Sequence, residues 1–241
     1  MEQKSGQQKD LEHRISLREI LSWLSLVGFV YGPLDERLGI RQALEKALKK
    51  PVPHHVNWTF CFGGITFFMF LVLAVTGILL LMYYRPTTAE AYASVVYITN
   101  EVPFGWLIRG LHFWAGNLMI IMVILHMLRV FFYGAYKSPR DLNWIAGFVL
   151  FMLTLGFGFT GYLLPWNQIS YWATTVGTEI PGAIPLVGDT LKYLTRGGAE
   201  VSQTTLTRFF AIHVVILPAI ISFFLAVHFA VIRRQGISGP L

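Results

Sequence analysis

Charged residues and cysteine are both scarce in this sequence. Only 13% of the 241 residues are charged, whereas 54% are hydrophobic, and the mean hydropathy is +0.55. This composition excludes an ordinary soluble domain, and the single cysteine, Cys61, excludes an internal disulfide. The charged first twenty residues lack a small-residue cleavage site, so no signal peptide is expected. The net charge of +6 is typical of cytoplasmic loops in a membrane protein, and nucleic acid is not an expected partner.

Long apolar runs make a helical membrane protein the predicted class. Runs of about 20 residues suit a bilayer core about 30 Å thick, and backbone groups in lipid must pair within their own segment. Residues 56–241 are therefore expected to form an all-α, four-transmembrane-helix bundle, and residues 1–55 a separate N-terminal segment with interfacial amphipathic helices. The expected spans, none of which contains an acidic residue, are 58–84, 110–133, 144–164 and 209–232.

Basic residues indicate how the spans are oriented. The N-terminal segment holds nine Lys and Arg residues, the loop 133–143 holds Lys137 and Arg140, and the C-terminus holds Arg233 and Arg234. Four spans place these three regions on one side of the membrane, which the positive-inside rule assigns to the cytoplasm or stroma. We therefore expect a multi-pass protein of a bacterial or thylakoid membrane with both termini on that side. The two remaining loops lie outside, and the longer one is expected to form short surface helices.

Two of the spans each contain a pair of histidines. His112 and His126 are fourteen residues apart, and His213 and His228 are fifteen apart. Fourteen helical residues rise about 21 Å and return nearly to the same face, whereas fifteen rise about 22.5 Å and miss it by about 60°. Because both spans run from outside to inside, His112 is expected level with His213. His126 is then level with His228, which gives two layers of paired imidazoles.

Paired imidazoles with no softer ligand suit the iron of a six-coordinate haem, since the porphyrin fills four positions. Zinc would require three or four protein ligands, and these two spans contain no Cys, Asp or Glu. The spacing thus predicts two stacked bis-histidine haems that form an electron path across the bilayer. Alternatively, the histidines are polar contacts between helices or a proton relay in a haem-free transporter. A purely structural scaffold of a larger complex is a further alternative.

Glycines and arginines extend this pattern. The glycine pairs of the other two spans repeat the fourteen-residue interval: Gly63 with Gly77, and Gly147 with Gly161. They are predicted to leave side-chain-free strips for the flat porphyrin, although glycine in a membrane helix is also typical of close packing. Arg109 and Arg129 lie one turn outside the histidines of their span. Each is predicted to pair with a haem propionate, or else to be an ordinary snorkelling arginine.

Together these features resemble the cytochrome b6 family, the four-helix haem subunits of cytochrome b6f and related quinol oxidoreductases. The resemblance begins near residue 31 and runs to residue 241, so the first 26–30 residues lie outside it. The fifteen-residue histidine interval favours the b6-type branch. The segments that carry the resemblance are HVNWTFCFGGIT (55–66), TGILLLMYYRPT (76–87), EVPFGWLIRGLH (101–112), ILHMLRV (124–130), FGFTGYLLPWNQISYWA (157–173), SQTTLTRFF (202–210) and IRRQGISGPL (232–241).

The resemblance implies which residues hold cofactors. His112 with His213 would bind an outer haem b. His126 with His228 would bind an inner haem b. It also implies a haem c attached by a single thioether at Cys61, with Arg233 meeting its propionates. No CxxCH motif is present, so the residues alone do not suggest this third haem.

The resemblance also implies the function and the partners. Electrons from quinol oxidised at the outer face would pass through the b haems to an inner haem c or quinone site, coupled to proton translocation. The expected partners are subunit IV, a Rieske iron–sulfur protein, a c-type cytochrome and a second copy of the complex, with a c-type cytochrome or plastocyanin as acceptor. Because the family's Pro-Glu-Trp-Tyr motif is absent and belongs to subunit IV, this chain is not expected to be active alone.

The resemblance implies that the end of the third span and the start of the following loop form this chain's wall of the quinol site, with Trp172 and Ala173 as contributors. Asn167 departs from the family, which typically has Asp at that position. The nearest competing interpretation is the di-haem cytochrome b anchor of a hydrogenase or formate dehydrogenase. Such an anchor is not expected to contain LLPWNQISYW or TLTRFF.

Overall fold

The computed structural model describes residues 39, 42, 45 and 53–239. The chain divides into two units, Met1–His54 and His55–Leu241, and the architecture below belongs to the second. The amphipathic segments expected at 15–32 and 35–50 lie outside the described residues. The described elements are η1 (Trp58–Cys61), α5 (Phe62–Leu81), α6 (Ala91–Asn100), α7 (Gly105–Phe132), α8 (Asp141–Leu163), α9 (Gln168–Gly182), α10 (Gly188–Arg196), α11 (Gln203–Ala211), η2 (Ile212–Ile216) and α12 (Leu217–Gln235).

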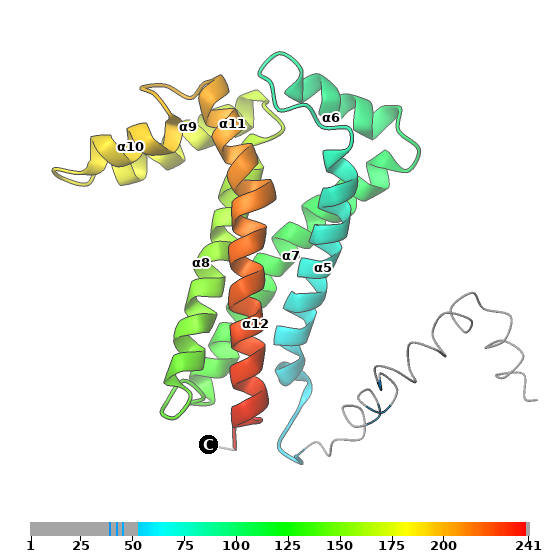
Figure 1. Ribbon diagram of the computed structural model, residues 1–241, viewed down its shortest axis with the longest axis vertical. Helices are drawn as coiled ribbons and strands as arrows, with labels where there is room; N and C mark the ends of the chain where they lie inside the picture. The colour runs from blue at the N-terminus through cyan, green and yellow to red at the C-terminus, as the bar shows by residue number, and fades with distance from the viewer. Residues whose placement is uncertain (1–38, 40–41, 43–44, 46–52, 240–241) are drawn as a thin grey trace, which may run out of the picture. The chain divides into compact units, whose positions relative to one another are not determined.

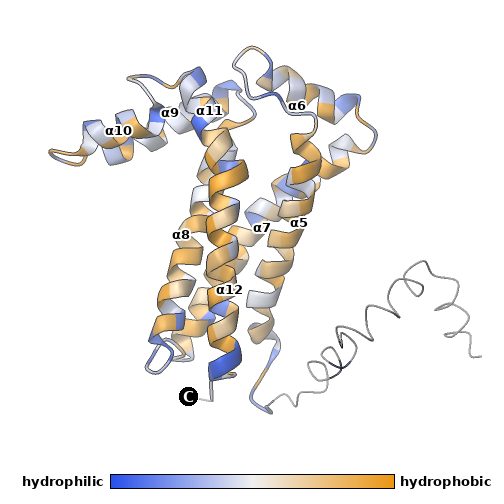
Figure 2. Cartoon of the chain, in the orientation of Figure 1, coloured by the Kyte–Doolittle hydropathy of each residue, from blue (hydrophilic) through white to orange (hydrophobic). Residues whose placement is uncertain are grey.

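Four helical segments are long and apolar enough to cross a membrane, which confirms the predicted four-helix class. Their bounds are Trp58–Leu81, Gly105–Phe132, Asp141–Leu163 and Gln203–Gln235. Hydrophobic residues cover most of the length of these helices, and hydrophilic residues gather at their ends (Figure 2). The fourth span is longer than predicted because α11, η2 and α12 continue one another without a break.

The bundle consists of two helix pairs. Helix α5 packs along α7, helix α12 packs along α8, and α7 also contacts α8 (Figure 1). Midway along the bundle, Met119, Leu150 and Ile221 form a buried apolar cluster from α7, α8 and α12. This cluster lies between the levels of the predicted histidine layers, because Met119 follows His112 by seven residues and precedes His126 by seven.

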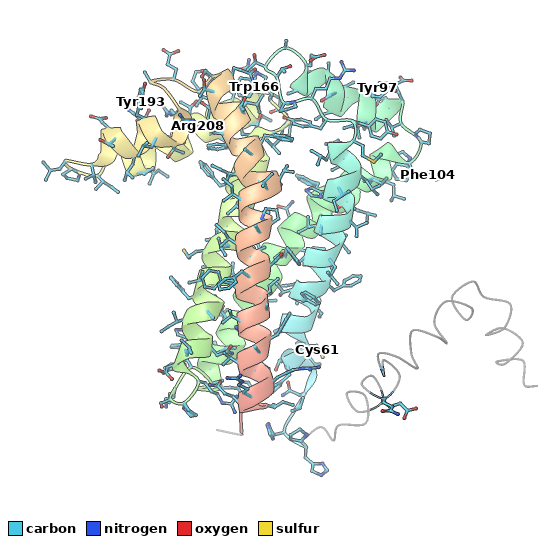
Figure 3. All side chains as sticks on the ribbon, viewed as in Figure 1. Cys61, Tyr97, Phe104, Trp166, Tyr193 and Arg208 are labelled. Atoms are coloured by element: carbon cyan, nitrogen blue, oxygen red, sulfur yellow. The ribbon has the colours of Figure 1, made fainter. Side chains whose placement is uncertain are left out.

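Both loops predicted to share one side of the membrane lie at the same end of the bundle, which we call the upper end, as in Figure 1. The lower end is the one that carries Cys61, labelled in Figure 3. The short helices expected in the second loop are present as α9 and α10, with α9 starting earlier than anticipated. Helix α6 in the first loop was not predicted, since its ten residues mix apolar with polar side chains such as Ser94 and Thr99.

Two polar contacts fix the upper end. The Tyr84 hydroxyl donates to the Leu164 carbonyl at 2.7 Å and so joins the end of α5 to the end of α8. Burial raises the pKa of the Tyr84 phenol above its ordinary value. The second contact is made by Gln203 on α11, whose side-chain amide donates to the Pro86 carbonyl at 3.0 Å. It also accepts from the Thr88 backbone N–H at 2.7 Å, so α11 is tied to the loop after α5.

A buried arginine holds the surface helices together. Arg196, only 3% exposed, ends α10 and donates to the Thr178 hydroxyl at 2.6 Å and to the Thr175 carbonyl at 2.7 Å. It also donates to the Glu179 carboxylate at 2.9 Å. Hydrogen bonds from Lys192 and Arg196 hold the pKa of this carboxyl below its ordinary value. Helices α9 and α10 are therefore fixed as one unit.

Candidate functional site

The structure brings His112 and His213 together in what we call the upper layer. His112 lies on α7 and His213 on η2, with ring centroids 6.4 Å apart and ring planes at 66°. Two metal–nitrogen bonds of about 2 Å, with roughly 1 Å from each nitrogen to its ring centre, add up to about 6 Å. The spacing of the two rings therefore has the size required to hold one metal ion between them.

A threonine hydroxyl lies beside Nδ1 of each upper ring. The Thr76 hydroxyl donates its proton to a carbonyl one turn earlier at 2.6 Å, and the Thr160 hydroxyl does so at 2.8 Å. Thr76 Oγ1 lies 2.9 Å from His112 Nδ1, and Thr160 Oγ1 lies 3.1 Å from His213 Nδ1. Because each hydroxyl proton already has a carbonyl acceptor, the geometry favours the tautomer in which Nδ1 carries the ring proton and donates to the hydroxyl oxygen. The lone pair of Nε2 is then left for a metal.

His126 on α7 and His228 on α12 form the lower layer. The His126 and His228 rings lie close enough for a charge on one to affect the other. Their Nδ1 atoms are buried and have no hydrogen-bond partner among the described residues. The main-chain carbonyl of Asn143 lies near the His228 ring but does not form a hydrogen bond with Nδ1. Buried polar atoms are rarely left unpaired, so these two orphans indicate a site built for a further group.

Each histidine packs against one of the four predicted glycines, on the helix beside its own. A Cβ added at the glycine would lie close to the imidazole Cε1: 3.3 Å for Gly77 and His112, 2.9 Å for Gly63 and His126, 2.6 Å for Gly161 and His213, and 3.5 Å for Gly147 and His228. In the structure the glycines leave room for the imidazoles, and the expectation that they also leave strips for a porphyrin remains a prediction. The shared fourteen-residue interval follows from this pairing, since each glycine must sit level with its histidine.

A π-helical turn explains the fifteen-residue interval. Residues Ile212–Ile216 form η2, a π-helix that contains His213. A π-turn holds one residue more than an α-turn, so it absorbs the extra residue and returns His228 towards the face that carries His213. Pro218 lies just after this turn and lacks the backbone N–H that an α-helix would use there. The expected 60° mismatch therefore does not separate the two histidines.

The arginines differ between the two ends. Arg129 lies 4.5 Å from the centre of the Phe60 ring, and its Nε is buried without a partner in the described part of the chain. Arg109 is exposed at the upper end of α7, where it lines a pocket with Trp114. Arg233 is exposed in the last turn of α12, five residues after His228. Their predicted contacts with propionates remain predictions.

Cys61 lies at the level of the lower layer. It ends η1, precedes α5 and comes two residues before Gly63, which faces His126. Its thiol is free and exposed (Figure 3). Both features are compatible with the predicted attachment of a haem, which remains a prediction.

Helix α9 carries the residues expected at the quinol site. Trp172 and Ala173 are exposed on it. Asn167 is its N-cap and accepts a hydrogen bond from the Ser170 backbone N–H at 2.9 Å. Asn and Asp cap helices equally well, which accounts for Asn at a position where the family typically has Asp.

Three residues with contacts at the site or between its surface helices were not predicted: Thr76, Thr160 and Arg196. The available signal for the threonines was the dipeptide Thr-Gly, which occurs at 76–77 and again at 160–161, directly before glycines that had been singled out. No comparable signal pointed to Arg196, because its side-chain partners lie 17 or more residues away and its other partners are main-chain atoms.

The donor set fits haem. In the part of the chain that the structure describes, no cluster of three or more His, Cys, Asp or Glu side chains could hold a metal ion. Each layer instead offers two imidazoles, the number that remains to be filled when a porphyrin supplies four nitrogens. The donors therefore suit a metal that arrives within a planar cofactor.

Comparisons with known proteins agree with this site. Residues 47–236 match the family described as cytochrome b/b6/petB. Cytochrome b6 of Synechococcus elongatus is 51% identical over 212 residues, which cover 88% of this chain and 99% of that protein. Cytochrome b6 of Gracilaria tenuistipitata var. liui is 49% identical over 215 residues, covering 89% of this chain and 100% of that protein.

A solved structure described as a hyperthermophilic respiratory complex III contains a chain of similar fold. The TM-score is 0.80 at 34% identity, over 89% of this chain and 56% of that chain. This chain therefore spans about half the length of the solved one. Because the family match covers most of the sequence, the chain belongs to the cytochrome b/b6 family.

Proposed function

We propose that this chain is the haem-binding cytochrome b subunit of a b6f/bc-type quinol oxidoreductase. In this role it carries electrons from the upper to the lower face of the membrane through two b haems, coupled to proton translocation. The observation that carries the proposal is the repeated layer, in which an imidazole from α7 is paired with one from η2 or α12, and each rests on a glycine. Family membership and the likeness to a complex III chain support it.

The histidines would hold the two haems. His112 and His213 are the proposed ligands in the upper layer. His126 and His228 are those in the lower layer. When bound, haem supplies the reversible one-electron chemistry of iron. The chain contributes Nε2 lone pairs, fixed ring orientations and, between the layers, the apolar Met119 cluster that excludes water.

Trp172 and Ala173 would form this chain's wall of the quinol site at the upper end. The Arg196 contacts keep α9 fixed and so hold this wall in place. The Pro-Glu-Trp-Tyr motif is absent from the sequence, so subunit IV would complete the site. A Rieske protein and a c-type cytochrome would receive electrons in a dimeric complex, and this chain would not oxidise quinol alone.

At the lower end, a haem c would be attached through one thioether at Cys61. The thiol is exposed and level with the lower layer, and Arg233 is exposed at the same end of the bundle. Lys137, Arg140 and Arg233 also belong to this end, so the positive-inside rule assigns it to the cytoplasmic or stromal side. Arg129 would pair with a propionate of the lower b haem, since its Nε is buried and otherwise unpaired among described residues.

The test is haem staining of the purified complex on a denaturing gel, beside its pyridine haemochrome spectrum. We expect a stained band at this chain and about two extractable b haems. Cys61→Ser should abolish the stain and leave the b haems in place. An unstained wild-type band would return Cys61 to the role of a small apolar residue. The absence of b haem from the wild-type complex would overturn the proposed function itself.

A further inference from the structure

The two layers differ in what their histidine Nδ1 atoms contact. In the upper layer both atoms meet a threonine hydroxyl, at 2.9 and 3.1 Å. In the lower layer neither has a hydrogen-bond partner within the described residues. Main-chain carbonyls lie near rings in both layers. In the upper layer these are the carbonyls of Leu73 and Phe157, and in the lower layer that of Asn143. The threonine hydroxyls are therefore the side-chain contacts that distinguish the Nδ1 atoms of the two layers.

The difference is written into the sequence directly before each glycine. Thr76 precedes Gly77 and Thr160 precedes Gly161, and these threonines are only 5% and 6% exposed. The residues that precede the lower glycines are Phe62 and Ala146, which carry no side-chain oxygen. The same scaffold thus supplies a hydrogen-bond acceptor at one level and withholds it at the other.

An acceptor on Nδ1–H changes the metal ligand on the far side of the ring. As the proton is drawn towards the hydroxyl oxygen, Nε2 becomes more basic and donates more electron density to iron. Greater donation stabilises the ferric state over the ferrous state and lowers the reduction potential. In the lower layer, the positive charge of Arg129 near His126 has the opposite effect. It disfavours the more positive ferric state and so raises the reduction potential.

We propose that Thr76 and Thr160 are positioning residues that fix the tautomers of His112 and His213 and hold the upper haem at a lower reduction potential than the lower haem. The proposal rests on the proposed function, since both layers must contain haem. With haem bound in both layers, this difference in reduction potential would favour the transfer of one electron from the upper haem to the lower haem. No bond or proton is exchanged in this transfer.

The experiment compares variants in the complete complex by anaerobic redox titration of the b-haem α-band, which resolves the two components. Thr76→Val and Thr160→Val keep the side-chain shape and remove the acceptor, whereas Thr76→Ser restores it. Thr154→Val is the matched control. Thr154 is 4% exposed on α8 and its hydroxyl also donates to a carbonyl one turn earlier, that of Leu150, at 2.9 Å, with no histidine as partner.

Each valine variant should raise the reduction potential of the lower-potential component, the upper haem, and leave that of the other component unchanged. A hydrogen bond of about 1 kcal/mol corresponds to roughly a fivefold change in the reduction equilibrium, or about 40 mV for one electron. The double variant should shift it about 25-fold, while Thr76→Ser and Thr154→Val match the wild type. If Thr76→Val loses that haem, the potential measured in Thr160→Val decides the test.

Unchanged potentials in both valine variants would overturn the inference, and so would an equal shift of both components or a shift in Thr154→Val as large as in Thr76→Val. These results leave two b haems in the wild type and therefore leave the proposed function intact. A wild-type complex without two b components would instead remove the proposed function on which the inference rests.

Discussion

The upper and lower layers share one scaffold and differ in their surroundings. Both consist of two imidazoles that rest on glycines of neighbouring helices. In the upper layer, hydroxyls of α5 and α8 satisfy both Nδ1 atoms. The lower layer keeps its Nδ1 atoms unpaired within the described chain and has a partly buried arginine beside it. The comparison teaches that ligation is repeated along the helices, whereas the chemistry of each site depends on residues that are not ligands.

The largest expected effect comes from removing a ligand at one level only. His112→Ala should abolish the upper b haem and His126→Ala the lower one, because a single imidazole cannot complete six-coordination. Haem content by pyridine haemochrome should fall from two b haems to one in each variant. Redox titration should show that a different component is missing in each. Loss of the same component in both variants would contradict the assignment of separate layers.

The π-turn predicts a contrast between two deletions. Deleting Val215 removes the extra residue of η2, restores a fourteen-residue histidine interval and leaves the helices on both sides in register. Both haems should be retained. Deleting Phe223 gives the same interval but leaves the π-turn and turns His228 by about 100° away from its layer, so the lower haem should be lost. Equal haem loss in both deletions, read from the α-band, would show that the π-turn does not set the register.

Glycine substitutions should separate the two levels on α8. A Cβ at Gly161 would lie 2.6 Å from His213 Cε1, whereas one at Gly147 would lie 3.5 Å from His228, an ordinary contact distance. Gly161→Ala should therefore lower the free energy of unfolding by about 1–3 kcal/mol through overpacking, and Gly147→Ala should lower it much less. The measurement is haem retention during a thermal ramp. Equal midpoints for the two variants would mean that these distances do not govern packing at the layers.

The smallest expected effect comes from the arginines. Arg129→Gln removes a partly buried charge near the lower layer and should lower the potential of that haem by the equivalent of about 1 kcal/mol, roughly fivefold in the equilibrium. Arg109→Gln should shift the upper haem less, because Arg109 is exposed and its charge is screened by salt. A redox titration at two ionic strengths checks this. A larger shift in Arg109→Gln would reverse the comparison.

Much of this arrangement could be predicted because helical geometry links spacing to position. The fourteen-residue interval in the second span places His112 and His126 on one face, and the equal glycine intervals place Gly63 and Gly77 at matching levels. The length of the apolar runs was sufficient to predict the four spans, since a membrane constrains the length and composition of each helix that crosses it.

The remainder depends on contacts that no interval contains. A regular helix misaligns His213 and His228, and only the π-turn around His213 resolves the mismatch. Thr76 and Thr160 were missed because threonine in a membrane helix usually donates to its own backbone, as both do. Their second contact, to a histidine on another helix, arises from the packing of helix pairs and is invisible in a single sequence.

The central claim, two bis-histidine haem layers on one repeated scaffold, is tested most directly by low-temperature EPR of the oxidised complex. The account predicts two low-spin ferric b-haem signals, each with its own midpoint potential. His213→Ala should remove the signal with the lower potential and leave the other unchanged. A single b-haem signal in the wild type, or a high-spin b haem, would contradict paired histidine ligation.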